Sequence, residues 1–225
     1  MPSTVVHAGF ALLLAAGLLG RYYDRRALAA LFVVIVLPEV DSFLGPLMSG
    51  AHRTVGHTLA FPALAAGLLY YDTRIRDRSL VRSRLGGPER AGRWIAVAWV
   101  ALFVHAFAHV GLDWTHLDGV NVVWPLRDQF VRLDGEIVFS TAEGFAQTFV
   151  EIRTDPETGR RAVDAGATGT TETVHVNNPV EPRDPDEITE EPVDRRFPVA
   201  NAGWRLYLIG LGLFTLAARR LQGDV

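Results

Sequence analysis

Six of the seven histidines in this 225-residue chain lie at the edges of apolar segments, a costly place for ionisable groups in a membrane protein. Three carboxylates, Glu39, Asp41 and Asp113, are interleaved with them. Because the chain has no cysteine, imidazole and carboxylate must hold any metal ion. This ligand set suits a zinc-type hydrolytic centre, and manganese or iron would suit it nearly as well. The six histidines are His7, His52, His57, His105, His109 and His116.

One segment carries three of these histidines at helical spacing. His105, His109 and Asp113 follow at intervals of four, and His116 lies three further on, so a helix would place all four within an arc of roughly 80°. We expect His109 and Asp113 to ligate a metal ion, the alternative being a structural ion pair or cap. His105 lies about one turn deeper and is expected to support the site. His116 is either a ligand or a loop residue.

Two shorter motifs add to this set. His52 and His57 flank Arg53 at the start of an expected helix, where anions are favoured and an arginine can bind phosphate through two hydrogen bonds. The alternative is an interfacial loop with its arginine at the lipid head groups. Glu39 and Asp41 follow the expected end of a helix, whose dipole disfavours negative charge. A bound cation would relieve that repulsion, as would solvent exposure.

The elements that must position these residues are expected to be membrane helices, because the apolar residues are gathered into blocks almost free of charge. We predict an all-α integral membrane bundle of about five helices, with a buried bundle of a soluble protein as the alternative. The second block is short, since 12 residues rise only about 18 Å, and extension back through Tyr22 and Tyr23 would lengthen it. The blocks are residues 5–20, 27–38, 57–71, 94–112 and 204–218.

Arginine clusters predict the orientation of the bundle. The loop 72–93 carries seven arginines against three acidic residues, which places it in the cytoplasm by the positive-inside rule. The arginines at 21, 25 and 26 and those at 219 and 220 fall on the same side if the helices alternate. The C-terminus is then cytoplasmic, whereas the N-terminus and residues 118–203 lie outside the plasma membrane. The histidine-bearing ends of the helices therefore meet at the outer face.

The chain is expected to divide into three parts. Residues 1–126 form a membrane domain of four helices with the metal site, and residues 204–225 form the C-terminal transmembrane helix. Residues 127–203 form an external polar insert, partly β and partly disordered. Within the insert we expect strands at 136–139, 148–152 and 171–176, a turn at 155–159 and a mobile tether at 177–196.

These motifs, in this order, resemble the YdjM-like family of membrane-bound metal-dependent hydrolases over roughly residues 1–126. The resemblance rests on His7 in the first helix, Pro38-Glu39-Val40-Asp41, His52-Arg53-x-x-x-His57, His109-x-x-Leu112-Asp113, Gly119-Val120 and Trp124-Pro125. The family usually has aspartate at the position of Glu39. Its second motif is usually tighter, so either His52 or His57 could be the ligand here.

The resemblance carries a functional expectation, because the family is distantly similar to zinc-dependent phospholipase C and the S1/P1-type nucleases. It implies a cluster of one to three divalent ions, most readily Zn²⁺. His109 and Asp113 match a His-x-x-x-Asp ligand pair, and Asp41 matches a bridging carboxylate. His7, His57 and His116 would complete the coordination.

Taken together, these features predict a membrane metal-dependent hydrolase, a phosphoesterase acting at the outer membrane surface. Arg53 would hold phosphate and Asp41 would position the attacking water. The expected partners are the lipid bilayer and a phospholipid or other phosphoester substrate, with no nucleic acid. The alternative is a non-catalytic membrane scaffold or regulatory protein with a structural metal site. Metal transport or haem ligation would need ligands at mid-membrane depth.

Overall fold

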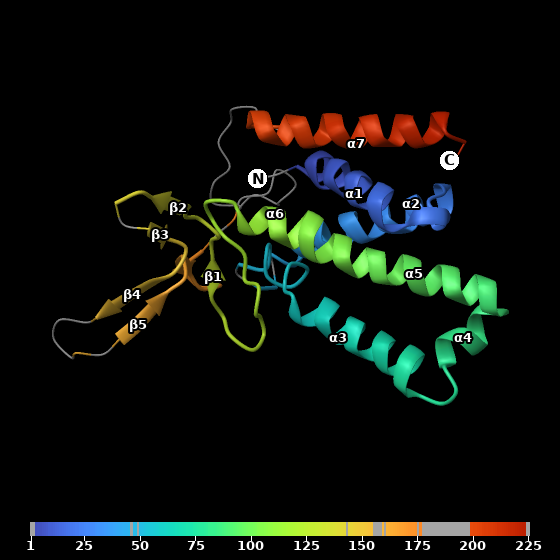
Figure 1. The fold of residues 1–225 in the computed structure, drawn as a ribbon. Helices are drawn as coiled ribbons and strands as arrows, with labels where there is room; N and C mark the ends of the chain where they lie inside the picture. The colour runs from blue at the N-terminus through green and yellow to red at the C-terminus, as the bar shows by residue number, and fades with distance from the viewer. Residues whose placement is uncertain are drawn as a thin grey trace, which may run out of the picture.

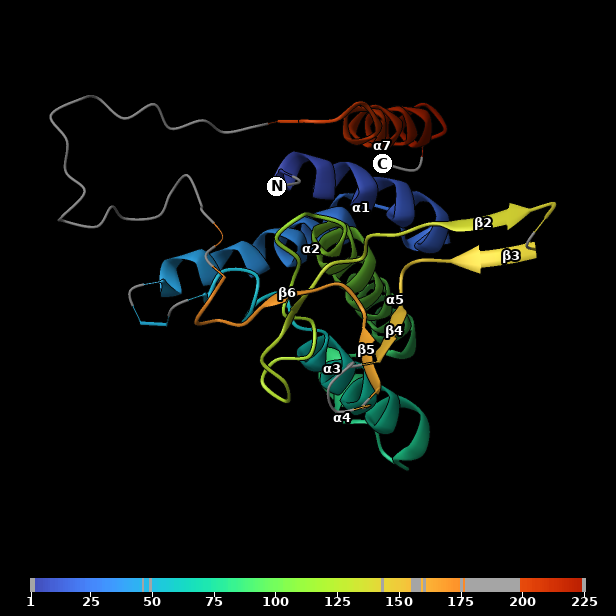
Figure 2. The same cartoon turned by 90° about the vertical axis from the view of Figure 1, so that its left-hand side faces the viewer.

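The computed structural model describes residues 3–45, 47–48, 50–142, 144–154, 159, 161–174, 176 and 199–223. The fold is mostly helical, with long helices lying side by side and small β-hairpins gathered at one end (Figures 1 and 2). A mostly helical protein with a small β region is therefore confirmed.

All five apolar blocks form helices. They correspond to α1 (Thr4–Leu18), α2 (Arg25–Val36), α3 (Ala60–Tyr70), α5 (Pro88–Val104) and α7 (Gly203–Leu221). The helix α5 continues through a π-helical turn, His105–Val110, into the short helix α6 (Gly111–Trp114). A further short helix, α4 (Leu80–Leu85), lies in the arginine-rich loop and was not expected; the Ser79 side chain accepts a hydrogen bond from its first turn.

Two apolar helices among the described residues are long enough to cross a membrane: Arg25–Leu44, with 20 residues, and Pro88–Trp114, with 27. The helix Arg25–Leu44 is extended at its C-terminal end, whereas the extension expected from the sequence was at its N-terminal end. Asp24 accepts hydrogen bonds from the backbone N–H groups of Arg26 and Ala27 and so begins α2, which excludes Tyr22 and Tyr23 from the helix. At its other end, α2 continues as the 3₁₀-helix Leu37–Leu44.

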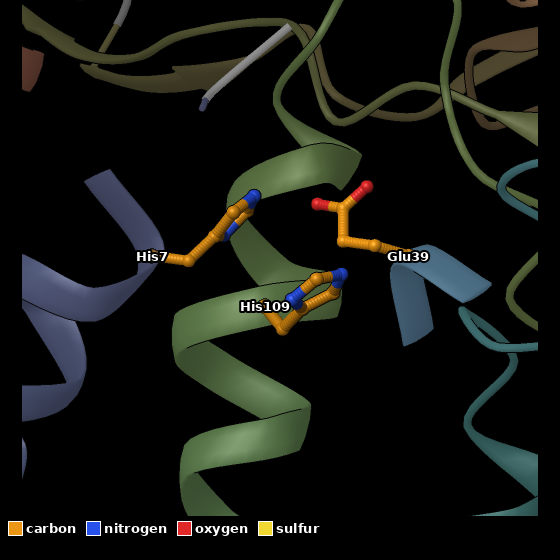
Figure 3. A group of neighbouring side chains, drawn as sticks. All are labelled: His7, Glu39 and His109. Atoms are coloured by element: carbon orange, nitrogen blue, oxygen red, sulfur yellow. The ribbon is translucent and has the colours of Figure 1, made fainter. Parts of the chain in front are cut away.

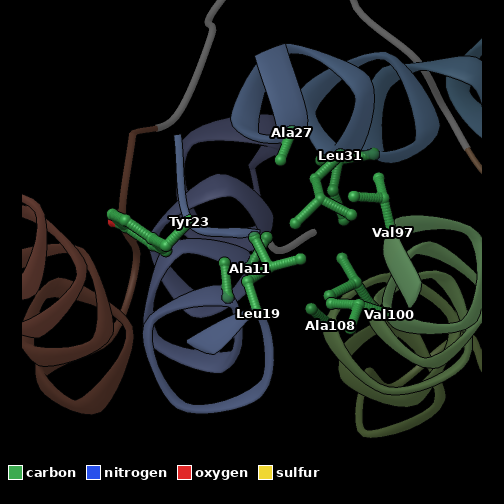
Figure 4. Packing of buried hydrophobic residues seen from close by; sticks show 11 residues of the cluster. Ala11, Leu19, Tyr23, Ala27, Leu31, Val97, Val100 and Ala108 are labelled. Atoms are coloured by element: carbon green, nitrogen blue, oxygen red, sulfur yellow. The ribbon is translucent and has the colours of Figure 1, made fainter. Parts of the chain in front are cut away.

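The apolar core lies between α1, α2 and α5. Figure 4 shows small and branched side chains of the three helices meeting there, among them Ala11, Leu31 and Val100. Outside this core α7 packs directly against α1, because glycines allow the two backbones to touch: a Cβ at Gly212 would overlap the backbone of Gly9. This contact lies within both helices and holds α7 against α1.

The arginine clusters and the histidine-bearing helix ends lie at opposite ends of the bundle. The arginines at 21, 25 and 26, the loop containing α4, and the end of α7 lie at one end of the bundle (Figure 1). The start of α1, the end of α6 and the β-hairpins lie at the other end. The expected gathering of the histidine-bearing helix ends therefore holds in the structure, whereas the side of the membrane on which they lie stays a prediction.

Within the described residues, the β region consists of antiparallel strand pairs. β2 (Ile137–Ser140) pairs with β3 (Gly144–Gln147), and β4 (Glu151–Thr154) pairs with β5 (Arg161–Asp164). β1 (Phe130–Val131) pairs with β6 (Ala167–Gly169) and fastens the insert beside the site.

The insert departs from expectation in two places. The strand expected at 148–152 overlaps β4 only at residues 151–152, because residues 149–150 form a bend between β3 and β4. The strand expected at 171–176 is wrong, because residues 171–173 form a turn in which the Thr173 hydroxyl and the Thr170 backbone bond to each other. Of the expected turn at 155–159 only Gly159 is described, and the expected tether at 177–196 lies outside the described residues.

Candidate metal centre

A histidine from a loop meets a histidine and an aspartate from the α5–α6 helix in the buried centre of the site. The Nε2 atom of His57 lies 2.9 Å from Nε2 of His109 and 3.1 Å from Oδ2 of Asp113, and the latter two atoms are 3.6 Å apart. Donors bound at 2.0–2.2 Å to one tetrahedral zinc ion lie about 3.3–3.5 Å from each other. The three observed distances, 2.9–3.6 Å, lie on either side of that range, so small shifts of the side chains would let the three atoms hold a single ion.

A second group shares one of these residues. His7, Glu39 and His109 each place a potential ligand atom within 4.8 Å of the others. Figure 3 shows the Glu39 carboxylate pointing from the 3₁₀-helix that follows α2 toward the two imidazoles, which stack with ring centroids 4.3 Å apart. The two groups could each hold a metal ion. They bring together five of the residues expected from the sequence: His7, Glu39, His57, His109 and Asp113.

The local backbone explains how the α5–α6 helix presents His109. The segment His105–Val110 is a π-helical turn, a feature that is rare and occurs mostly at functional sites. Within this turn the carbonyl of Ala108 accepts a hydrogen bond from Nδ1 of His7 at 2.8 Å. Because Nδ1 donates, the neutral His7 ring has its lone pair on Nε2, the atom directed toward the site.

Asp41 orients the histidines of the loop. Its Oδ1 accepts from Nδ1 of His52 at 2.9 Å, and its Oδ2 accepts from Nδ1 of His57 at 2.9 Å and from the backbone N–H of Gly56 at 3.0 Å. In its neutral form, each ring then carries its lone pair on Nε2. A carboxylate that fixes the tautomer of a histidine ligand in this way is a common feature of metal sites.

The loop reaches Asp41 only because Gly56 lies against the start of the 3₁₀-helix Leu37–Leu44. A Cβ at Gly56 would be 2.7 Å from Cα of Pro38, closer than side chains approach. Of the two histidines that the sequence left open, His57 belongs to a ligand group. His52 lies on the other oxygen of Asp41, and its own Nε2 is buried without a hydrogen-bond partner.

Arg53 is completely buried beside this centre, in a backbone conformation (φ 63°) that is uncommon for a residue with a side chain. Its Nη2 lies 3.6 Å from Oδ1 of Asp113, and its Nη1 donates to Nδ1 of His116 at 3.1 Å and to the Gly119 carbonyl at 3.3 Å. Its Nε and Nη2 groups have no hydrogen-bond partner. Such buried, unpartnered donors at a strained backbone position are typical of functional sites.

His116 and His105 flank the centre without joining the two ligand groups. His116 follows the end of α6 and lies 3.1 Å from Asp118. Burial and the nearby charge of Arg53 lower the pKa of His116 to about 4, so it is neutral and accepts from Arg53. His105 stacks in parallel beside His109, with ring centroids 6.2 Å apart, and bonds to the backbone of Val34 in α2.

The unpartnered atoms show that these residues suit a metal ion. Nε2 of His7 and Nδ1 of His109 are buried and have no hydrogen-bond partner. An unpaired polar atom costs about 1–3 kcal/mol when buried, and coordination to a cation would remove that cost. With nitrogen and oxygen donors and no thiolate, the set suits Zn²⁺, Mn²⁺ or Fe²⁺.

One residue near the site was missed by the sequence reasoning. Arg205 of α7 is buried, stacks on the Trp204 ring and donates to the Asn201 side chain. It is close enough to Asp113 and Arg53 for their charges to act on it. The only sequence signal was an arginine at the start of an otherwise apolar helix, which is also the pattern of an arginine at the lipid head groups.

Comparison with known families gives this arrangement a context. The family model described as YdjM inner membrane protein matches residues 1–172, more than half of the chain. The chain therefore belongs to the YdjM inner membrane protein family, and association with a lipid bilayer follows from that membership. We found no match to the chain among curated proteins or among solved structures.

Proposed function

We propose that this protein is a metal-dependent phosphoesterase of the membrane. The observation that carries the proposal is the convergence of Nε2 of His57, Nε2 of His109 and Oδ2 of Asp113 beside an arginine with unpartnered N–H groups. Three protein ligands leave a coordination position open, which is the arrangement of catalytic zinc sites. A divalent ion held there would acidify a bound water and polarise a phosphoryl oxygen.

The protein's own side chains have separate parts in this proposal. Arg53 binds the non-reacting phosphate oxygens through Nε and Nη2, and its bonds to His116 and Gly119 keep the guanidinium in place. Arg205 adds positive charge at the same side. Asp41 holds His57 in the tautomer that ligates. The resemblance implies that Asp41 bridges metal ions. Its hydrogen bonds to His52, Gly56 and His57 instead support a residue that orients the histidines.

A second candidate is favoured by one observation: His7, His57 and His109 have no solvent exposure at all. A structural ion that braces the bundle would be buried in this way. His7 or Glu39 would then close the coordination around the ion, and no water would remain. The protein would be a scaffold whose insert binds a partner.

The test is metal analysis of the purified protein followed by assay on a panel of phosphomonoesters and phosphodiesters. We expect bound zinc and turnover that is lost in Arg53→Met while the zinc stays. The matched control is Arg93→Met, at the arginine-rich end of the bundle, which should change neither. Absence of turnover on the whole panel, with X-ray absorption showing four protein ligands and no oxygen from water, would select the scaffold.

We also propose the orientation already expected, with the site at the outer face and the arginine clusters in the cytoplasm. Its support is that the structure gathers the three clusters at one end of the bundle. The absence of native cysteine makes labelling direct. A thiol reagent that cannot cross membranes should label Ser140→Cys in intact cells and should label Ser83→Cys only after lysis. Labelling of position 83 in intact cells contradicts this orientation.

A further inference from the structure

An apolar groove lies between α3 and α5 and begins beside the metal centre. It has a volume of about 680 Å³, and every residue that lines it is apolar. Leu59, at one end, is two residues from His57, so the Cα atoms of the two residues lie within about 7 Å of each other. From Phe107 to Trp99 the groove follows α5 over about 12 Å, and Leu18 of α1 also lines it. The groove therefore extends from the site toward the arginine-rich end.

The groove is open because small residues of α3 face α5. Ala63 and Ala66 line it, whereas the larger Leu64 and Leu68 point away and are 62% and 60% exposed. None of the residues of α3 is buried, so this apolar helix stands apart from the core of the bundle. On the opposite wall, the rings of Phe103 and Phe107 stack with centroids 4.3 Å apart. Small side chains on one wall and flat rings on the other leave a channel of the kind that a hydrocarbon chain fills.

We infer that this groove holds one acyl chain of a membrane lipid whose phosphate group reaches His57 and Arg53. The inference rests on the proposed phosphoesterase function and narrows its substrate to a lipid phosphoester. Membership of an inner membrane family places acyl chains against this apolar surface. The start of the groove beside His57 then brings the attached phosphate to the metal centre. A water-soluble phosphoester would leave the groove unused.

The kinetic test compares two p-nitrophenyl phosphodiesters that differ only in a methyl or a dodecyl group. With zinc-loaded protein in nanodiscs, we expect the KM of the dodecyl ester to be at least about tenfold lower, because each buried CH₂ favours binding. Ala66→Phe, which fills the groove, should remove that difference and leave the KM of the methyl ester unchanged. Leu68→Phe is the matched control: it enlarges an exposed neighbour outside the groove and should behave as the wild type.

A binding measurement separates this inference from the proposed function. Dodecylphosphonate should bind more tightly than methylphosphonate and more tightly than dodecanol, and Ala66→Phe should abolish its advantage over methylphosphonate. If the two esters are turned over equally and Ala66→Phe changes neither rate, the groove does not bind an acyl chain, but the proposed phosphoesterase function stands. If dodecylphosphonate binds more tightly than methylphosphonate but neither ester is turned over, the lipid site stands and the proposed phosphoesterase function is wrong. Dodecanol binding as tightly as dodecylphosphonate would show a bulk-lipid contact and overturn the inference.

Discussion

The two ends of the helical bundle use the same residue types in opposite ways. At the arginine-rich end, charged side chains lie largely in solvent, and Arg93 pairs with the half-exposed Asp24. At the other end, Arg53, His57, His109 and Asp113 are all buried and point at one another. Burial makes each unpaired charge costly, so the second arrangement persists only if its groups satisfy each other or a ligand. The exposed charges at the first end are of the kind that orients a protein in the membrane. The buried charges at the second end are of the kind found at functional sites.

The largest difference is expected from removing one arginine at each end. In the metal-free protein, Arg53→Met should lower the free energy of unfolding by about 3–5 kcal/mol, because it removes the arginine that pairs with the buried carboxylate of Asp113. Arg93→Met should cost at most about 1 kcal/mol, since both side chains of its ion pair are partly exposed. Denaturation in mixed micelles measures both. Similar losses for the two variants would remove the distinction between the ends.

Zinc affinity tests whether His109 and Asp113, at the buried end, are metal ligands. His109→Ala and Asp113→Ala should each weaken zinc binding by more than about 100-fold, because even residues that only orient ligands affect affinity by 10–100-fold. Elemental analysis and competition with a chelator measure the loss. His105→Asn is the control, since His105 stacks on His109 but lies outside both ligand groups. Zinc retained in the His109→Ala, Asp113→Ala double variant would show that the ion binds elsewhere.

A smaller effect is expected at the carboxylate that orients the loop histidines. Asp41→Asn should lower zinc affinity by about 10–100-fold and abolish phosphodiester turnover, while the protein still inserts and folds. Asp118→Asn changes a more exposed carboxylate beside Arg53 and should leave affinity nearly unchanged. The same chelator competition compares them. An Asp41→Asn protein with wild-type affinity would mean that the Asp41 contacts are not needed to hold the ligands.

The smallest effect is expected at the arginine-rich end, where Asp24 begins α2. Asp24→Ala should cost about 1 kcal/mol of stability, the usual value for a lost helix cap, and should not alter zinc content. Asp24→Ser is the control, because a serine hydroxyl can also cap the helix. Loss of zinc in Asp24→Ala would contradict the independence of the two ends.

Much of the fold could be predicted from local features. Runs of apolar residues predict α1, α2, α3, α5 and α7, because a helix satisfies its own backbone in an apolar environment. The boundaries were less predictable. The backward extension through Tyr22 failed since the Asp24 cap, a single side-chain interaction, begins α2, and the strand expected near Thr173 is replaced by a local hydroxyl turn.

The residues that the structure brings together in the candidate centre could also be predicted, because their types and helical spacing are present in the linear chain. His109 and Asp113 come from one helix, and His57 was one of two alternatives. The sequence alone could not choose between His52 and His57, since that choice depends on which ring reaches Asp113 once Gly56 packs against Pro38. The burial of Arg53 was likewise open, because the same motif suits a loop at the head groups.

The sequence by itself determined the helical membrane architecture and the donor set of nitrogen and oxygen atoms, because both depend on composition and local spacing. Only the tertiary structure decided the tautomers set by Asp41, the approach of Arg205 and the groove beside Ala66. These features depend on contacts between segments that are far apart in the chain. Such contacts arise from packing, which no local pattern encodes.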